Sequence, residues 1–173
     1  MTVRSGPHAV NCYPLPTDRA FRPGDCVQLD IGCIVEGYVS DTNRTVVVGT
    51  ATDEQRELLR VGQTMLERGL AAIRPGARAA DVWRACFEVA EGAGMADRVT
   101  IPFAGHGLGL GLHEEPYVWP ESDTILEAGM VIALEPGVYA PGIGGSRPED
   151  TVVVTASGSE LLTHYPRDFD LLP

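Results

Sequence analysis

The chain has 173 residues, 44% of them hydrophobic, which is enough to bury one core and is the length of a single domain. Its 24 acidic and 13 basic residues give a net charge of -11, which disfavours nucleic acid as a partner because phosphate binding needs a basic face. No apolar run approaches the roughly 20 residues that cross a bilayer, and the N-terminus lacks an apolar signal core, so we expect a cytoplasmic protein without membrane contact.

The first predicted element is a strand. Apolar and polar residues alternate over 26–31, which is the period of a half-buried strand and puts Asp30 on its polar face. Strand character continues over 34–49, with a turn near Glu36. A hairpin is therefore expected over 24–49.

Two helices are predicted next. The sequence Thr52-Asp-Glu-Gln is a capping box that opens the first helix, and Arg74-Pro-Gly ends it. A second helix is expected over 79–93, with Gly94 as its stop. Both lie between the first hairpin and a second one predicted over 129–155.

Glycine alternates with other residues at positions 105, 107, 109 and 111. This spacing fits neither G-x-G-x-x-G nor G-K-[ST], so nucleotide binding is not expected. Alternating glycines in a strand instead let another backbone or a ligand approach closely. His106 and His113, in this predicted strand, are placed to reach a site, although the backbone alone could satisfy a strand histidine.

The two predicted hairpins repeat one pattern. In each, a Gly precedes an apolar strand, an acid ends that strand (Asp30 or Glu135), and a second acid opens a Val-rich strand (Asp41 or Glu149). Taken singly, each acid could face solvent at a strand end or turn. Together they would form a cluster that repels itself and loses hydration unless a multivalent cation lies in it. A metal site is the leading hypothesis.

The local contexts of these residues resemble a known family. Leu-Asp-Ile-Gly, Ser-Asp-Thr-Asn-Arg-Thr, Gly-His-Gly-Leu-Gly, Leu-Glu-Pro-Gly and Arg-Pro-Glu-Asp-Thr surround Asp30, Asp41, His106, Glu135 and Glu149, in that order. This set is similar to the ligands of the pita-bread metallopeptidases (the creatinase/aminopeptidase superfamily), and segments 37–45 and 135–150 resemble the Xaa-Pro aminopeptidase and prolidase branch. The resemblance covers nearly the whole chain. It implies an α+β fold with a curved, mostly antiparallel sheet, helices on its outer face and the site on its inner face.

The resemblance also implies how the ligands divide. Asp30 would bind one divalent ion, His106 and Glu135 the other, and Asp41 and Glu149 would bridge the two. Four carboxylates and one imidazole suit manganese, with cobalt, iron or zinc as alternatives. Such a pair lowers the pKa of a bridging water and polarises a carbonyl, so hydrolysis by a metal-bridging hydroxide is expected.

Three residues are expected to act in catalysis. His113 would hydrogen-bond the substrate or the developing oxyanion. Glu135 would also carry a proton from the water to the leaving amine. Arg147 resembles the arginine that orients the acids and the substrate, although it could equally be a buried counter-charge for Glu149 or Asp150.

Two departures from the family pattern stand out. The family usually carries a histidine shortly before the first ligand strand, whereas this chain has Cys12 there, and a thiol is a weak hydrogen-bond partner. The helices expected before the first hairpin are missing, as is the N-terminal domain of the Xaa-Pro branch. We therefore expect a truncated chain whose open face is covered in a homodimer or by another chain.

The sequence thus predicts a dinuclear metal-dependent exopeptidase that removes the N-terminal residue of a short peptide with proline in second position. Two alternatives stay open, namely a hydrolase of the same fold that acts on a small non-peptide amide, and a binding or scaffold protein without turnover. Residues 1–173 are expected to form one catalytic-type domain, with helices over 53–94 between the hairpins. The four cysteines show no CxxC pairing and are expected to be reduced.

Overall fold

The structure is a computed structural model that describes residues 1–11 and 14–169. The helices are α1 (Asp53–Ala72), α2 (Ala79–Gly92) and two short 3-10 helices, η1 (Gly6–Val10) and η2 (Ala96–Arg98). The strands are β1 (Thr2–Ser5), β2 (Cys26–Ile31), β3 (Ile34–Val35), β4 (Tyr38–Val39), β5 (Thr42–Val47), β6 (Gly105–Gly107), β7 (Glu114–Val118), β8 (Val131–Leu134), β9 (Val138–Ala140), β10 (Gly144–Ser146), β11 (Asp150–Val154) and β12 (Ser159–Leu161).

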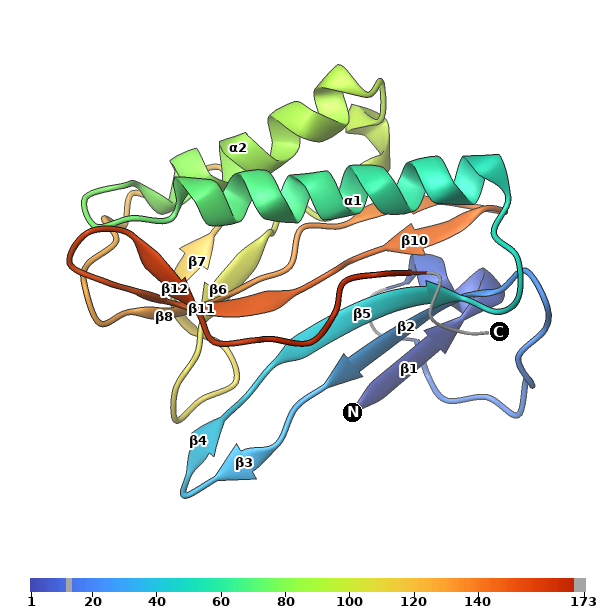
Figure 1. The fold of residues 1–173 in the computed structure, drawn as a ribbon, viewed down its shortest axis with the longest axis horizontal. Coiled ribbons are helices and arrows are strands. Elements are labelled where there is room, and N and C mark those ends of the chain that lie inside the picture. The colour runs from blue at the N-terminus through green and yellow to red at the C-terminus, as the bar shows by residue number, and fades with distance from the viewer. Residues whose placement is uncertain (12–13, 170–173) are drawn as a thin grey trace.

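All strand pairs within the described ranges are antiparallel. One sheet has the order β1-β2-β5, a second has the order β12-β11-β8-β6-β7, and β3-β4 and β9-β10 form two-stranded sheets. Figure 1 shows α1 and α2 together on one side of the strands, while the β3-β4 hairpin projects away from the helices. This arrangement leaves the face opposite the helices for the predicted ligands.

The two halves of the chain repeat the same hairpin. In the first half, β2 pairs with β5 and the small β3-β4 hairpin lies between them in the chain. In the second half, β8 pairs with β11, and β9-β10 occupies the corresponding place. The internal repeat read from the two acid-bearing segments is therefore present in the strand pairing.

The N-terminal residues differ from expectation. The sequence analysis identified no strand ahead of the first hairpin, but β1 and η1 lie there, and β1 pairs with β2 along its whole length. The register places Thr2 opposite Asp30 and Arg4 opposite Gln28. Because four residues carry too little periodicity to identify a strand, only the pairing with β2 reveals this element.

The helices confirm the boundaries expected from their caps. The Gln55 N–H donates to Thr52 Oγ1 over 3.2 Å, and the Thr52 N–H donates to Gln55 Oε1 over 3.0 Å, which completes the capping box. α1 packs closely on its neighbours, because a Cβ at Gly69 would overlap the Cys86 sulfur and lie 2.7 Å from Leu134 Cδ2. This close approach fixes α1 against both α2 and β8.

The main core lies between the two helices and the five-stranded sheet. It joins α1 and α2 residues such as Leu66 and Val82 to sheet residues such as Ile132, each at most 1% exposed. Cys26, Cys33 and Cys86 are free thiols, as expected, and Cys12 lies outside the described residues. In the part of the chain that is described, neither helix has the length and apolar character needed to span a bilayer.

Candidate metal centre

The five predicted ligands come from both hairpins and from β6. Asp30 lies in β2, His106 lies in β6, Asp41 and Glu149 directly precede β5 and β11, and Glu135 directly follows β8. Because paired antiparallel strands bring the end of one strand beside the start of the next, each hairpin places its two acids side by side. The repeated pattern therefore supplies two pairs of acids.

Contacts between β5 and β11 bring the two pairs together. The Glu149 N–H donates to the Asn43 carbonyl over 3.0 Å, and the Thr151 hydroxyl donates to the Asp41 carbonyl over 2.8 Å. These bonds join hairpins that are about a hundred residues apart in the sequence. The two acids that precede their strands, Asp41 and Glu149, thus lie at one junction.

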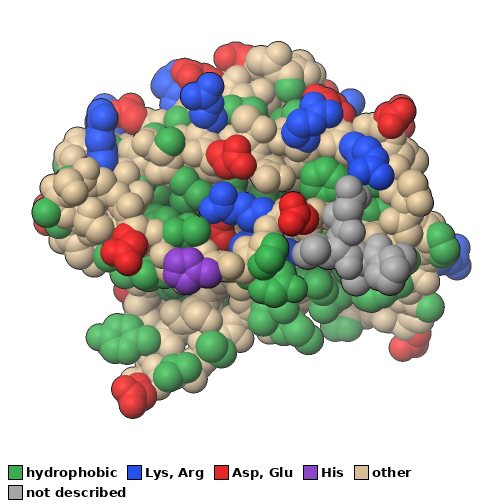
Figure 2. Space-filling model, viewed as in Figure 1, with side chains coloured by type: hydrophobic (Ala, Val, Ile, Leu, Met, Phe, Trp, Pro, Cys, Tyr) green, Lys and Arg blue, Asp and Glu red, His purple; other side chains and the backbone are tan. Residues whose placement is uncertain are grey.

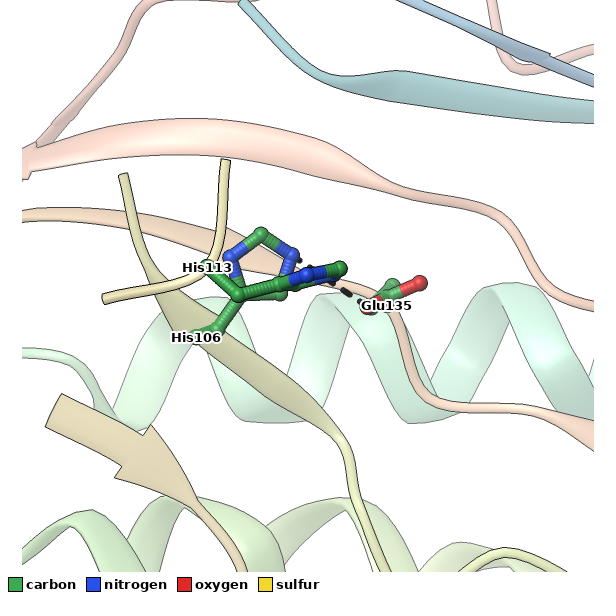
Figure 3. A group of neighbouring side chains, drawn as sticks. All are labelled: His106, His113 and Glu135. Carbon is green, nitrogen blue, oxygen red and sulfur yellow. Dashed lines mark ion pairs between the residues drawn. The ribbon is translucent and has the colours of Figure 1, made fainter. Parts of the chain in front are cut away.

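His106 is at the centre of two groups of donor atoms. One group contains Asp41, His106 and Glu149, the other contains His106, His113 and Glu135, and the ligand atoms within each group lie within 4.8 Å of one another. His106 Nε2 is 3.4 Å from Glu135 Oε1 and 3.7 Å from Asp41 Oδ2. Figure 3 shows the His113 ring beside His106, near Glu135.

The orientation of His106 follows from its backbone contact. His106 Nδ1 lies 2.9 Å from the Gly107 carbonyl, to which it can only donate, so Nε2 is the atom that faces the acids. Burial alone would lower the pKa of His106, but Glu135, the Gly107 carbonyl and Asp41 together raise it. A side chain with 0% exposure is thereby held in one orientation.

Glu149 gives the strongest indication that this centre can bind a cation. Its side chain is 1% exposed, and neither carboxylate oxygen has a hydrogen-bond partner among the described residues. Burial, with Glu135 and Asp41 nearby, raises its pKa well above the usual value. Because a buried, unpaired carboxylate is unfavourable, its donor set fits a cation that prefers oxygen ligands. These residues therefore fit the divalent ions that the sequence implies.

Asp30 has two arginine partners. Arg147 Nη2 donates to Asp30 Oδ2 and to Glu135 Oε2, each over 2.8 Å, and Arg4 Nη2 donates to the same Asp30 oxygen over 2.5 Å. Arg147 therefore contacts Asp30 and Glu135, and its positive charge also opposes the rise in the pKa of Glu149, so a role as a counter-charge for Glu149 stays open. Arg147 thus lies between acids that come from different hairpins.

The side chains at this centre border an open cavity of about 460 Å³. The polar wall includes Asp30, Asp41, His113, Glu135 and Arg147; the apolar wall includes Cys33, Ile34, Val39 and Leu112. Figure 2 shows acidic and basic side chains near the middle of the face turned to the viewer, and hydrophobic side chains on the part of the molecule that projects at the lower left. A ligand in this cavity could thus contact both charged and apolar groups.

The prediction that His106 and His113 lie in one glycine-rich strand is wrong. The strand β6 ends at Gly107, residues 108–113 form a loop, and β7 begins at Glu114, so His106 and His113 are not in one strand. The loop is held by the Val39 N–H, which donates to the Gly109 carbonyl over 2.9 Å, and by the Gly111 N–H, which donates to Glu114. The loop turns His113 back toward His106, with ring centroids 4.3 Å apart.

Close approach at the glycines of β6 is confirmed. A Cβ at Gly105 would overlap the Ala133 carbonyl, and one at Gly107 would overlap the Glu115 carbonyl. The strand β6 is therefore enclosed by β8 and β7. Because only glycine fits there, the backbone of His106 comes close enough to the hairpins for its ring to meet their acids.

Sequence patterns missed two side chains at this centre. Arg4 is 1% exposed and contacts Asp30, and Asn43 is 0% exposed and lies directly opposite Asp30 in the β2-β5 register. Neither amide atom of Asn43 has a hydrogen-bond partner among the described residues. A prediction of the β2-β5 register would have identified Asn43, because residues directly opposite each other lie on the same face of a sheet. Cys12, the other residue singled out from the sequence, lies outside the described residues.

The acid cluster predicts that the metal-free protein loses stability as pH rises. Burial and the neighbouring Asp30 and Glu135 raise the pKa of Asp41 from 3.8 to about 6. A carboxyl whose folded pKa exceeds its unfolded value favours folding at low pH, and this contribution is lost as pH rises through the folded pKa. Glu149 acts in the same direction. Urea unfolding in the presence of a chelator should therefore give a larger free energy of unfolding at pH 5 than at pH 8.

The variant Asp41→Asn isolates this contribution, since it removes the titrating group and should flatten the profile between pH 5 and pH 7. His113 opposes the trend, because burial and His106 lower its pKa, but its side chain is exposed. Stability that increases over this range, or an unchanged profile in Asp41→Asn, would contradict the expectation.

Comparisons with known proteins agree with this geometry. The model of metallopeptidase family M24 matches residues 1–156. The Xaa-Pro dipeptidase of Lactobacillus helveticus is 36% identical over 171 residues, which are 99% of this chain and 46% of that protein. The chain thus spans about half the length of the curated relatives it matches.

Solved structures share the fold. The dipeptidase PepE from Mycobacterium ulcerans has a TM-score of 0.93 at 38% identity, covering 97% of this chain and 45% of that one. The prolidase from Pyrococcus furiosus has a TM-score of 0.92 at 35% identity, covering 95% and 49% of the two chains. The predicted α+β pita-bread fold is confirmed. Because the family model matches most of the sequence, the chain belongs to metallopeptidase family M24.

Proposed function

We propose that this chain carries the catalytic centre of a dinuclear metal-dependent exopeptidase that cleaves short peptides with proline in second position. The observation that carries the proposal is Glu149, a fully buried carboxylate without a hydrogen-bond partner in the described structure, beside Asp41 and His106. Metallopeptidases of this family use divalent metal ions, and the named relatives include Xaa-Pro dipeptidases. Residues 1–173 act in this proposal as one catalytic-type domain.

The ligand assignment follows the resemblance to the family, and the two groups of donor atoms around His106 support four of its five residues, all but Asp30. His106 and Glu135 hold one ion, Asp30 holds the second, and Asp41 and Glu149 contact both. Manganese is the favoured metal because most of the donors are carboxylate oxygens, with cobalt, iron or zinc as alternatives. Two such ions, when bound, would lower the pKa of a water between them and polarise the carbonyl of the scissile bond.

The remaining groups of the site orient the substrate and move protons. Burial and His106 lower the pKa of His113, so its ring is neutral at neutral pH and can donate an N–H to an oxygen of the substrate. Burial would raise the pKa of Glu135, but His106 and Arg147 lower it overall, so this carboxylate is ionised and can accept a proton. Arg147 fixes Asp30 and Glu135 relative to each other through Nη2.

The cavity supports a small substrate with an apolar part. Ile34, Val39 and Leu112 line the same cavity as the charged groups and offer an apolar surface against which an apolar side chain or a proline ring would lose water. In this proposal the substrate is a short peptide. A second copy of this chain, or another protein chain, covers the open side of the cavity.

Hydrolysis and metal binding should be measured together on the 173-residue chain. After treatment with a chelator and addition of manganese, we expect two ions per chain and hydrolysis of a Leu-Pro dipeptide that exceeds hydrolysis of Leu-Ala. His113→Ala should lower kcat by about 10²-fold or more with little change in metal binding, since one lost oxyanion donor has this effect. His164→Ala, at an exposed position, is the matched control.

Three results would oppose the proposal. A folded chain that binds no divalent ion would favour a scaffold protein. Two bound ions with turnover of small amides but not of peptides would favour the second hydrolase hypothesis. Full turnover in His113→Ala would remove the role assigned to this histidine.

A further inference from the structure

The ring of His113 is exposed and has no hydrogen bond of its own within the described part of the chain. It lies against the His106 ring, with centroids 4.3 Å apart, and Figure 3 shows the two rings beside each other. His106 differs, because its own Nδ1 is bonded to the Gly107 carbonyl. The direction in which His113 points is therefore set by the backbone of the loop that carries it, residues 108–113.

This loop has little intrinsic rigidity. Residues 108–113 run Leu-Gly-Leu-Gly-Leu-His between β6 and β7. Glycine loses more conformational freedom on folding than any other residue, so Gly109 and Gly111 make a single loop shape unfavourable unless bonds hold it. Leu110 and Leu112 are exposed, so their packing does little to hold the loop. Its shape must come from polar contacts.

Glu114 supplies such a contact from inside the loop. Its Oε1 accepts the N–H of Gly111. A Cβ at Gly109 would lie 3.0 Å from Glu114 Oε2, and a Cβ at Gly111 would lie 3.0 Å from Glu114 Oε1. The carboxylate therefore lies against both glycines, with one oxygen beside each. Hydrogen bonds from an N–H to a carboxylate are shorter and stronger than those to a neutral acceptor, so this contact can hold the loop in one shape.

Glu114 is itself fixed by the strand that carries His106. It is the first residue of β7 and is directly opposite Gly107 in the β6-β7 register. A Cβ at Gly107 would lie 2.9 Å from the Glu114 carbonyl oxygen, so the two strands are in close contact there. Glu114 is thus joined through its backbone to the strand of His106 and through its side chain to the loop of His113. It can fix one histidine relative to the other.

The loop has one further support, on the side of the projecting hairpin. The Val39 N–H donates to the Gly109 carbonyl over 2.9 Å, and the Gly109 N–H donates to the Gly111 carbonyl over 3.2 Å. The bond from β4 holds the beginning of the loop. Glu114 holds Gly111, which is only two residues before His113, so it has the more direct effect on this histidine.

We propose that Glu114 is a positioning residue that acts through His113. By accepting the Gly111 N–H, it holds the loop in the shape that turns His113 toward His106 and the cavity, and it touches neither substrate nor metal. The inference rests on the proposed function, since it needs His113 to hydrogen-bond the substrate or the developing oxyanion. A misplacement of about 1 Å in a catalytic group can lower the rate by about 10²-fold, so the shape of this loop decides how much His113 contributes.

A double-mutant cycle on the manganese-loaded 173-residue chain tests this role, with a Leu-Pro dipeptide as the substrate. Glu114→Ala should lower kcat by about 10²-fold, with a smaller change in KM and with the bound ions retained. Glu114→Gln keeps an acceptor for the Gly111 N–H and should remain within about fivefold of the wild type. In the His113→Ala background, Glu114→Ala should lower kcat by no more than about a further twofold, because its effect passes through the absent ring.

Nuclear magnetic resonance of the metal-free chain gives a readout that does not depend on turnover. The wild type should show a nuclear Overhauser contact between the rings of His106 and His113, whose centroids are 4.3 Å apart. Glu114→Ala should lose this contact, and Glu114→Gln should keep it. Gly111→Ala, whose Cβ would press on the Glu114 carboxylate, should weaken it and replaces Glu114→Ala if that variant does not fold. Glu115→Ala, at the exposed neighbouring acid, is the matched control and should change neither the contact nor the rate.

An equal loss of kcat from Glu114→Ala in the wild-type and His113→Ala backgrounds would overturn the inference, because Glu114 would then act independently of His113. An intact ring contact in Glu114→Ala would also overturn it, while leaving the proposed function in place if the wild-type chain cleaves Leu-Pro. No turnover in a folded, manganese-loaded wild type would contradict the proposed function instead. The ring contact alone would then decide whether Glu114 positions His113.

Discussion

Replacing Glu149 by Gln is expected to abolish binding of at least one ion and to lower kcat/KM for a dipeptide by about a thousandfold or more. Glu149 is in one of the two donor groups around His106, and its carboxylate has no other partner in the described part of the chain. An amide has no negative charge and binds a divalent ion weakly. Several kcal/mol of transition-state stabilisation would be lost with the ion, and every 1.4 kcal/mol corresponds to about a tenfold change in rate.

The same substitution should make the metal-free protein more stable. Burial, Glu135 and Asp41 raise the pKa of Glu149 well above its usual value, so folding at neutral pH forces an unfavourable charge or an uptake of a proton. A neutral side chain of similar shape avoids this cost, which is on the order of 1 kcal/mol for each pKa unit. Urea unfolding in chelator should therefore show a gain, and addition of manganese should stabilise the variant less than the wild type.

Glu160→Gln is the matched control, because Glu160 is an exposed glutamate in β12. It should change neither the number of bound ions nor the rate. If Glu149→Gln binds two ions with wild-type affinity, the assignment of Glu149 as a ligand is wrong. If it is less stable than the wild type in chelator, the explanation of its buried charge is wrong.

Arg44→Met is expected to have the largest effect on stability, a loss of about 3–5 kcal/mol, because it removes a buried guanidinium from one oxygen of the buried acid Asp150. Arg44 Nη2 donates to Asp150 Oδ1 over 2.7 Å, and Asp150 is 0% exposed. Arg44 Nη1 donates to the carbonyls of Asn43 and Glu149 over 2.8 and 2.5 Å. One side chain thus joins β5 to β11 where the two ligand pairs meet.

Arg44 also binds the segment near the end of the chain. Its Nε donates to the Pro166 carbonyl over 2.9 Å, and its Nη2 donates to the Tyr165 carbonyl over 2.8 Å. Methionine fills a similar volume but can satisfy none of these acceptors. The loss should therefore exceed that from removing a single hydrogen bond, which is about 1 kcal/mol.

Equilibrium unfolding in urea at pH 7, without metal, measures this loss. Arg68→Met is the control, since Arg68 is exposed on α1 and its replacement should change the free energy of unfolding by no more than about 0.5 kcal/mol. A loss below about 1 kcal/mol in Arg44→Met would show that Arg167, which also contacts Asp150 over 2.5 Å, is a sufficient partner for this acid.

Local patterns were enough for the helices and the acid-bearing hairpins. The capping box at Thr52 and the glycine after α2 are signals contained in a few neighbouring residues, and both helices begin and end as these signals indicate. Alternation in 26–31 likewise identified β2 and the face that carries Asp30. The prediction of one domain over 1–173 stays a prediction.

The sequence by itself indicated which carboxylates and which histidine are candidate ligands, because each stands in a short motif of neighbouring residues. Only the tertiary structure decided what surrounds them. The place of Arg4 behind Asp30 depends on the register of β1 with β2, and that of Arg147 depends on the contact of β5 with β11. The loop that turns His113 toward His106 depends on a bond from β4. Such contacts join residues far apart in the chain, and periodicity carries no information about them.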